Sequence, residues 1–430
     1  MSKSWIKYDA STTDFPIQNL PYGIFKPGSK ASPRVGVAIG DYVLDLHAAA
    51  KIFEEKFFSK FDVDKCFNTD SLNNFMSLGP SAWSMTRKFL QTVLAEGYEG
   101  VGLGRIQDDC LYERKSCIML LPAKIGDYTD FYSSREHATN VGTMFRGKEN
   151  ALMPNWLTLP VGYHGRASSV VVSGTNIRRP HGQMQKHPTD KTQGSVFGKC
   201  KLMDFELEIG AFVGVGNAMG TTIDVNEAAE KHIFGLVLMN DWSARDIQKW
   251  EYVPLGPFGG KNLGTTISPW VVPMEALKPF RCATSAGTQT PKPHPYLQLK
   301  DYRSYDIKLQ VAIENKHGWK GPHVISKSNF KNMYWTVEQQ LAHHTITGCN
   351  MKPGDLYGSG TISGTTPDSF GSMLEICWKG TKPLNMPDGS QRKFLKDGDD
   401  VVMTGYCQGN GYRVGFGECR GMILPALNMP

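Results

Sequence analysis

Glycine and proline are spread along this whole chain, and their distribution limits what it can fold into. The 430 residues include 45 glycines and 25 prolines, which exceeds average usage. Both residues interrupt helices, so such a chain favours many short strands and turns over long helices. We therefore do not expect an all-helical bundle, and we predict a mainly β or α+β fold.

The chain length and a change in sequence pattern near residue 120 predict two domains. With 40% hydrophobic residues, the chain can bury a large core, and domains of roughly 100–200 residues suggest two or three units. Residues 98–118 are mixed and charged without periodicity, and short strands punctuated by glycine begin beyond Leu120. We expect a small domain over residues 1–118 and a large domain over residues 119–430.

Local patterns predict several elements. A two-residue Gly40-Asp41 turn between apolar-rich segments indicates a type II′ hairpin over residues 34–46. An apolar stripe that starts at a proline and ends at a glycine predicts an amphipathic helix over 80–97. Two further helices are expected over 134–146 and 243–250, and the polar stretch 183–199 is expected to be a surface loop.

The charge and cysteine content narrow the class of function. Lysine and arginine exceed aspartate and glutamate, for a net charge of +6, without any long run of like charges. We therefore expect no nucleic-acid partner and no membrane patch, and the basic excess fits an acidic small molecule. The nine cysteines include no C-x-x-C pair, and the opening residues lack an apolar secretory region. Reduced thiols and a cytoplasmic location are expected.

Three acids alternate along the segment 201–213. Side chains alternate across a strand, so Asp204, Glu206 and Glu208 would share one face. Such adjacent like charges repel unless solvent or a cation separates them. Both a solvated polar face and a metal site remain open at this point.

A second acid follows an apolar run. Residues 233–239 predict a buried strand that ends at Asn240-Asp241, and Ser243 could cap the helix that follows. Asp241, Arg245, Gln248 and Tyr252 then recur at helical spacing. The alternative is an ordinary helix face with one acid–arginine pair.

A histidine is expected in the first turn of the helix over 134–146. A helix N-terminus favours the neutral imidazole that a general base requires, so His137 is a candidate base. A lone histidine is more often structural, and this alternative applies still more to His343 and His344.

Common cofactor and nucleophile motifs are absent from the sequence. The glycine-rich turns 257–266 and 357–364 let backbone N–H groups approach a ligand, but neither is a P-loop, and 214–220 misses the dinucleotide pattern. There is no H-E-x-x-H, no Cys/His zinc cluster and no G-x-S-x-G. The remaining candidate ligands are carboxylates, which select Mg²⁺ or Ca²⁺, with Mn²⁺ possible.

Five long strings resemble the fumarylacetoacetate hydrolase family. They are DFPIQNLPYG (14–23), GDYTDFYSS (126–134), PVGYHGR (160–166), MNDWSARD (239–246) and GSGTISG (358–364). The resemblance implies a small N-terminal Src-homology-3-like β-barrel, a large C-terminal mixed β-roll and a homodimer. It also implies metal-dependent hydrolysis of 4-fumarylacetoacetate, a diketo acid, to fumarate and acetoacetate, the last step of tyrosine and phenylalanine breakdown.

The resemblance also implies roles for individual residues. The metal ligands would be Asp130, Glu206, Glu208 and Asp241, with Lys261 and Thr265 beside the ion. His137 would be the general base, oriented by Glu375, an acid in an otherwise apolar strand over 372–376. The oxyanion would be met by Arg245, Gln248 and Lys261. The substrate would contact Tyr132, Arg146, Tyr163, Gln248, Tyr252 and Thr361. Two positions depart from the family pattern, Glu136 in place of glutamine and Gly259 in place of a bulkier residue.

Other readings share the same carboxylate site. Relatives that resemble acylpyruvate hydrolases, oxaloacetate decarboxylases or hydratases use the same fold. A non-catalytic metal-binding relative would be expected to have lost His137, Glu375 or Lys261, and all three are present.

Overall fold

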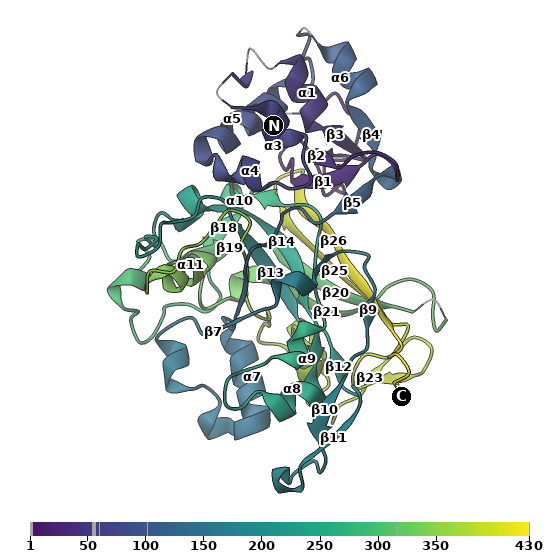
Figure 1. The fold of residues 1–430 in the computed structure, drawn as a ribbon, viewed down its shortest axis with the longest axis vertical. Helices are drawn as coiled ribbons and strands as arrows, with labels where there is room; N and C mark the ends of the chain where they lie inside the picture. Colours follow the sequence, from purple (N-terminus) through teal and green to yellow (C-terminus); the bar gives the residue numbers. More distant parts are fainter. Residues whose placement is uncertain (1–2, 54–56, 60, 101, 316, 430) are drawn as a thin grey trace.

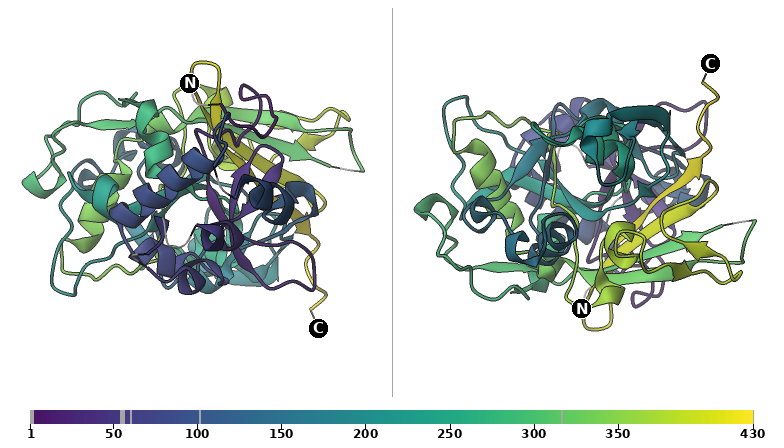
Figure 2. Two further views of the ribbon diagram at one scale, coloured as in Figure 1. Left: turned by 90° about the horizontal axis from the view of Figure 1, so that it is seen from above. Right: turned by 90° about the horizontal axis from the view of Figure 1, so that it is seen from below.

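The chain is a mixed α+β protein with a small N-terminal part and a larger C-terminal part (Figure 1). The computed structural model describes residues 3–53, 57–59, 61–100, 102–315 and 317–429. Seen from above, the N-terminal elements cover one end of the larger part (Figure 2). None of the helices within these ranges is both long and apolar enough to cross a membrane.

The N-terminal part is built on one antiparallel sheet with the strand order β4–β3–β2–β1–β5. Its strands are β1 Tyr22–Lys26, β2 Arg34–Ile39, β3 Tyr42–Asp45, β4 Leu111–Glu113 and β5 Ile118–Leu120. The predicted hairpin is confirmed, because Ile39 pairs with Tyr42 across a two-residue turn. Gly40 has a φ of 54°, which glycine adopts without strain. Its helices are α1 Leu46–Ile52, α3 Val63–Phe67, α4 Asn73–Ser77, α5 Pro80–Val93 and α6 Leu103–Asp109.

The helix predicted over 80–97 is present but shorter. Helix α5 begins at Pro80 as expected and ends at Val93. Residues near the start of the chain bind the carbonyl groups at the C-terminal end of α5. The Trp5 indole donates to the Val93 carbonyl (2.9 Å), and the Ser4 hydroxyl donates to the Leu94 carbonyl (2.7 Å). This partner lies about ninety residues away in the sequence, so local periodicity could not reveal it.

Residues 98–118 are more ordered than their lack of periodicity predicts. They contain α6 and β4, and β5 starts at Ile118. Strands β4 and β5 pair with β3 and β1, on opposite edges of the sheet. Strands of three residues are too short to show an alternating pattern.

Two main sheets form the centre of the C-terminal part. The first is mixed, with the order β7–β6–β22–β13–β14–β16–β8 and β17 attached to β14. Its strands are β6 Tyr128–Phe131, β7 Gly162–His164, β8 Val170–Val172, β13 Leu207–Val213, β14 Ile233–Asp241, β16 Thr265–Ile267, β17 Val272–Pro273 and β22 Leu356–Gly358. The second has the order β21–β20–β25–β26–β9. It contains β9 Ile177–Arg178, β20 Lys308–Glu314, β21 His323–Asn329, β25 Asp400–Gln408 and β26 Arg413–Leu424.

The two sheets share one apolar core. Leu236 and Leu238 of β14 belong to the same buried cluster as Val311 of β20 and Met403 of β25. The sheets curl around this interior, as the two views of Figure 2 show. The predicted buried strand over 233–239 is confirmed, since every residue of β14 is buried.

Three of the predictions for this part need correction. Helix α7 (Arg135–Arg146) is confirmed, but α8 (Arg245–Glu251) follows strand β15 (Ser243–Ala244), so Ser243 pairs in a strand and does not cap the helix. The stretch 183–199 belongs to a hairpin of β10 (His181–Gln185) and β11 (Ser195–Lys199). Glu375 lies in helix α12 (Met373–Ile376), capped by Ser372, and not in a strand.

The remaining elements are short. They include β12 Met203–Asp204, α9 Gly259–Asn262, α10 Met274–Leu277, β18 Arg281–Ala283, β19 Arg303–Tyr305, α11 Val337–Thr345, β23 Leu384–Asn385 and β24 Gln391–Arg392. All nine cysteines are free thiols.

Candidate metal centre and active site

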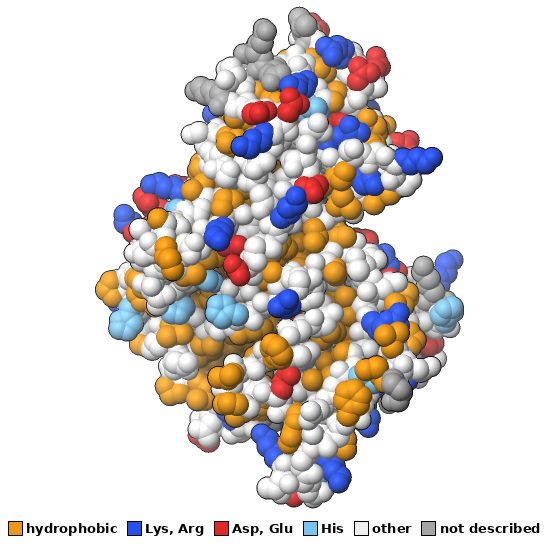
Figure 3. Space-filling view, viewed as in Figure 1, with side chains coloured by type: hydrophobic (Ala, Val, Ile, Leu, Met, Phe, Trp, Pro, Cys, Tyr) orange, Lys and Arg blue, Asp and Glu red, His pale blue; other side chains and the backbone are white. Residues whose placement is uncertain are grey.

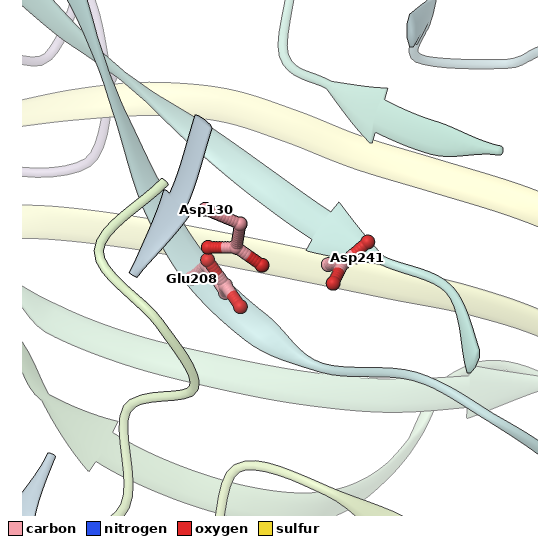
Figure 4. A group of neighbouring side chains, drawn as sticks. All are labelled: Asp130, Glu208 and Asp241. Carbon is pink, nitrogen blue, oxygen red and sulfur yellow. The ribbon is translucent and has the colours of Figure 1, made fainter. Parts of the chain in front are cut away.

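Three buried carboxylates from three strands of the mixed sheet come close together. Asp130 lies on β6, Glu208 on β13 and Asp241 at the end of β14, and one carboxylate oxygen from each lies within 4.8 Å of the others. Their side chains point toward one another (Figure 4). We call Asp130, Glu208 and Asp241 the carboxylate group.

A glycine makes this approach possible. Strand β22 lies between β6 and β13, and its Gly358 stands opposite Asp130. A Cβ atom at position 358 would lie 2.5 Å from Oδ1 of Asp130 and 2.8 Å from Oε2 of Glu208. Any larger residue would therefore push the two carboxylates apart.

The carboxylate group has the chemistry of a site for a hard cation. Burial, reinforced by the neighbouring carboxylates, raises the pKa of Asp130 and of Glu208 well above the ordinary value. Within the described residues, Oδ1 of Asp130 and Oε1 of Glu208 have no hydrogen-bond partner. Oxygen ligands that need a positive partner suit Mg²⁺ or Ca²⁺.

Polar groups surround Asp241. The Tyr163 hydroxyl donates to Oδ2 of Asp241 (2.9 Å) and to Oδ2 of Asp130 (3.2 Å), and the Thr265 hydroxyl donates to Oδ1 of Asp241 (3.3 Å). The ammonium group of Lys261 forms ion pairs with Asp241 and Glu206. Lys261 thus links the carboxylate group to its neighbour Glu206.

The acids of segment 201–213 are all buried, so the solvated-face alternative is wrong. Glu206 lies outside the carboxylate group, and Nη2 of Arg245 contacts its Oε1 at 2.8 Å. Burial alone would raise the pKa of Glu206, but Arg245, Lys261 and His137 outweigh it and hold this pKa well below the usual range. Asp204 binds Nε of Arg245 at 2.8 Å and fixes that guanidinium.

His137 is held by Glu375. Ser134 caps α7 by accepting the backbone N–H of His137 (3.2 Å), which places the ring in the first turn. Nδ1 of His137 lies 2.7 Å from Oε2 of Glu375, and Nε2 lies 3.6 Å from Oε1 of Glu206. The free ring nitrogen therefore faces the acids.

The environment of Glu375 keeps it ionised. Its carboxylate accepts hydrogen bonds from Asn140 (2.9 Å), Ser363 (2.9 Å) and Ser372 (2.8 Å). Burial raises the pKa of Glu375, but the lowering by His137, Asn140 and Ser372 is larger, so the pKa lies below its ordinary value. An ionised carboxylate only accepts, so the proton of the neutral imidazole belongs on Nδ1 and Nε2 keeps a free lone pair.

The expected substrate contacts lie at different depths. The Tyr132 ring is 5.3 Å from the His137 ring, Gln248 accepts from Arg245 (3.2 Å), and Thr361 is buried. Arg146 is exposed and donates to the carbonyls of Asn150 and Ala151. The structure therefore brings Tyr132 and Gln248 to the site's charged residues and leaves Arg146 nearer the surface.

Exposed apolar side chains lie between α8 and α9. They include Tyr252, Val253, Leu255 and Phe258. Figure 3 shows hydrophobic side chains gathered over the lower part of this face. Glu251 accepts the backbone N–H groups of Phe258, Gly259 and Gly260, which fixes the turn before Lys261.

Sequence reasoning missed several residues that support the site. They are Asp204 as the partner of Arg245, the donors to Glu375 (Asn140, Ser363 and Ser372), Glu251 and Gly358. Asn140 could have been found, because it lies three residues after His137 on one helix. Ser372 could also have been found, because Ser372-Met-Leu-Glu375 is a local capping pattern. Glu251 contacts residues seven to nine positions later, and the remaining residues depend on contacts between segments farther apart in the sequence.

Comparison with known families assigns both parts of the chain. A model described as "Fumarylacetoacetase N-terminal" matches residues 18–122, and one described as "Fumarylacetoacetate (FAA) hydrolase C-terminal" matches residues 127–423. The chain belongs to the fumarylacetoacetate hydrolase family.

Relatives within the fumarylacetoacetate hydrolase family match nearly the whole chain. The fumarylacetoacetase of Homo sapiens is 58% identical over 424 residues, covering 97% of this chain and 98% of the relative. That of Dictyostelium discoideum is 55% identical over 433 residues, with 99% and 98% covered. A solved fumarylacetoacetate hydrolase from Exiguobacterium antarcticum shares the fold, with a TM-score of 0.51, 16% identity, and 94% and 99% covered.

Proposed function

We propose that this chain hydrolyses the carbon–carbon bond of 4-fumarylacetoacetate to give fumarate and acetoacetate, the last step of tyrosine and phenylalanine breakdown. The observation that carries the proposal is the 58% identity, over 97% of the chain, to a relative named fumarylacetoacetase. The arrangement around the carboxylate group supplies a group for each chemical step.

The proposed metal ligands are Asp130, Glu206, Glu208 and Asp241, with Lys261 and Thr265 beside the ion. The unpartnered oxygens of Asp130 and Glu208 support this assignment. A bound Mg²⁺ or Ca²⁺ would supply Lewis acidity toward the oxygens of the diketone. Lys261 would have to release the carboxylates that it contacts here.

His137 is the proposed general base. Its Nε2 takes a proton from water, which then attacks the fumaryl carbonyl carbon, a contribution of about 10²–10⁴-fold in rate. Glu375 holds Nδ1 and stabilises the imidazolium that forms. The 2.7 Å contact between these two side chains supports the assignment.

The proposed oxyanion site consists of Arg245, Gln248 and Lys261. Their N–H groups meet the negative charge that develops on the attacked carbonyl oxygen. When the carbon–carbon bond breaks, its electron pair moves to the acetoacetate carbon, and Nζ of Lys261 donates a proton to it. The two ion pairs of Arg245, with Asp204 and Glu206, support a fixed position for the guanidinium.

The substrate is proposed to be bound through the carboxylates at its two ends. Arg146 and the phenolic hydroxyls of Tyr132, Tyr163 and Tyr252 would bind the carboxylates, and Thr361 would line the inner wall. The pKa of Tyr132 is raised by burial and by Glu375 and Glu206, while Arg146 and Arg245 lower it. The charge of Arg146 thus acts on Tyr132, which supports the proposal that both bind the same substrate.

The finer architecture is also part of the proposal. We propose that the N-terminal sheet forms a Src-homology-3-like barrel and that the larger part is a β-roll. The division predicted after residue 118 falls within β5 (Ile118–Leu120), and because β5 pairs with β1, we propose that the boundary lies after Leu120. A homodimer in the cytoplasm is proposed, and the nine free thiols support the location.

Loss of the diketone's ultraviolet absorbance tests the proposed reaction. The purified protein is treated with a chelator, Mg²⁺ or Ca²⁺ is restored, and acylpyruvate and oxaloacetate serve as control substrates. Metal-restored loss with fumarylacetoacetate, and lower activity with both controls, is expected. Folded, metal-bound protein without turnover of fumarylacetoacetate, or with faster turnover of a control, would overturn the proposal.

A further inference from the structure

A small cavity lies where the first turn of α11 meets β18 and the segment before β14. Its volume is about 240 Å³, and none of its lining residues belongs to the site described above. At roughly 30 Å³ per water molecule, the cavity has room for about eight waters, so it is larger than a site for one buried water. Drug-sized ligands occupy roughly 300–1,000 Å³, so an occupant of this cavity is smaller.

One wall carries a carboxylate without a partner. Glu338, at the second position of α11, is only 3% exposed. Across the described ranges, neither Oε1 nor Oε2 accepts a hydrogen bond. Burial raises the pKa of Glu338, and its own backbone N–H, the Thr336 hydroxyl and the charge of Arg281 offset this only in part. A buried carboxylate in this state needs a donor.

A second wall carries a cation that is also incompletely paired. Arg281, at the start of β18, lines the same cavity, and its buried Nε–H has no acceptor among the described residues. The other lining acids are already paired: Asp301 lies 2.8 Å from Arg303, and Glu230 lies 3.5 Å from Lys278. Glu338 and Arg281 therefore remain as a buried acceptor and donor of opposite charge, and the exposed Lys300 is a further cation of the lining.

The rest of the lining favours a ligand with a short apolar portion. Val225, Ala229 and Leu299 contribute aliphatic surface between the charged walls. A free metal ion would leave Arg281 unpaired, and a simple anion would leave Glu338 unpaired. A molecule with both charges satisfies both groups.

We propose that this cavity binds a small α-amino acid with a short aliphatic side chain. Its ammonium group donates to the two oxygens of Glu338, and its carboxylate accepts from Nε of Arg281. Its side chain packs against Val225, Ala229 and Leu299.

Isothermal titration calorimetry on the full chain tests this proposal with L-alanine and L-valine at up to about 10 mM, since weak sites have dissociation constants near 1 mM. Saturable binding of at least one of them is expected. N-acetyl-L-alanine lacks the ammonium charge and L-alaninamide lacks the carboxylate, so each is expected to bind roughly tenfold more weakly than L-alanine, or worse.

Variants locate the binding. Glu338→Gln and Arg281→Gln are each expected to weaken binding about tenfold or more. Glu227→Gln, which alters a surface pair with Lys231 outside the cavity, serves as the matched control and is expected to leave binding unchanged. Without ligand, Glu338→Gln is expected to melt no lower than the parent, because its carboxylate has no protein partner.

Three results would overturn the proposal. One is no saturable binding of either amino acid. Another is binding of either analogue that is as tight as the binding of L-alanine. The third is unchanged affinity in both cavity variants. The analogues probe the same contacts without mutation, so the test remains decisive even if a variant does not fold.

Discussion

Nδ1 of His137 lies 2.7 Å from Oε2 of Glu375, and both side chains are buried. Asn140, Ser363 and Ser372 hold the same carboxylate, so its position does not depend on the histidine alone. This relationship directs the free Nε2 of His137 toward Glu206 and the space beside the carboxylate group.

Glu375→Gln is expected to lower kcat by about 10²–10⁴-fold. The amide can donate to Nδ1, which moves the ring proton to Nε2 and removes the lone pair that accepts a proton from water. Metal affinity is expected to change little, because Glu375 is not among the carboxylates that would hold the ion. Steady-state rates at saturating Mg²⁺ and calorimetric metal titration provide the measurement.

Glu136→Gln is the matched control for Glu375→Gln. Glu136 lies beside His137 on α7, and its ion pair among the described residues is with Arg135 at 3.5 Å. The kcat of the Glu136→Gln variant is expected to stay close to that of the parent protein. Full activity in Glu375→Gln would show that His137 needs no carboxylate partner.

Glu208→Gln is expected to weaken metal binding and to stabilise the metal-free protein. Burial and the neighbouring acids raise the pKa of Glu208, so its ionised form is unfavourable in the metal-free protein, and the substitution removes this carboxylate. Metal affinity should fall by roughly tenfold or more, by comparison with changes around metal ligands. In the presence of a chelator, the Tm should rise by a few degrees. A variant with unchanged metal affinity would remove Glu208 from the ligand set.

Gly358→Ala is expected to impair metal binding more than folding. The added Cβ would lie 2.5 Å from Oδ1 of Asp130 and would displace this carboxylate. Metal affinity and kcat/KM should both fall, by about tenfold or more. Gly28→Ala is a suitable control, because a Cβ there meets nothing within 4 Å. Equal behaviour of the two variants would contradict the role of Gly358.

Acid is expected to destabilise the parent more than Glu375→Gln. His137 and the surrounding donors outweigh burial and lower the pKa of Glu375 in the folded state. A carboxyl whose pKa is lowered on folding stabilises the protein above its unfolded pKa of about 4.3, and this stabilisation is lost as the pH falls through the folded value. Urea unfolding at pH values from about 5 downward should show a shallower loss in the variant. Parallel pH profiles would contradict this linkage.

Elements with a strong local pattern could be predicted from sequence. The apolar run that ends at Asp241 is strand β14, and the capped helix that carries His137 is α7. The helix around Glu375 was missed, because a four-residue apolar run does not distinguish helix from strand. The β10–β11 hairpin was also missed, because polar residues and glycine together make up most of both strands.

The site was predictable in its residue types and less so in its arrangement. Alternation along one segment correctly drew attention to Asp204, Glu206 and Glu208, but only Glu208 joins the carboxylate group. Asp204 and Glu206 instead bind Arg245, which comes from α8. Alternation defines the face of a strand, whereas the charges brought by other elements decide which acids come together.

Turnover of fumarylacetoacetate in H₂¹⁸O, followed by mass spectrometry of the products, would decide whether water cleaves the carbon–carbon bond. Attack of water on the fumaryl carbonyl predicts one ¹⁸O atom in the new carboxylate of fumarate, an equal amount of acetoacetate, and no release of carbon dioxide in the same step. Fumarate without ¹⁸O, or stoichiometric carbon dioxide in place of the two acids, would contradict the proposed hydrolysis.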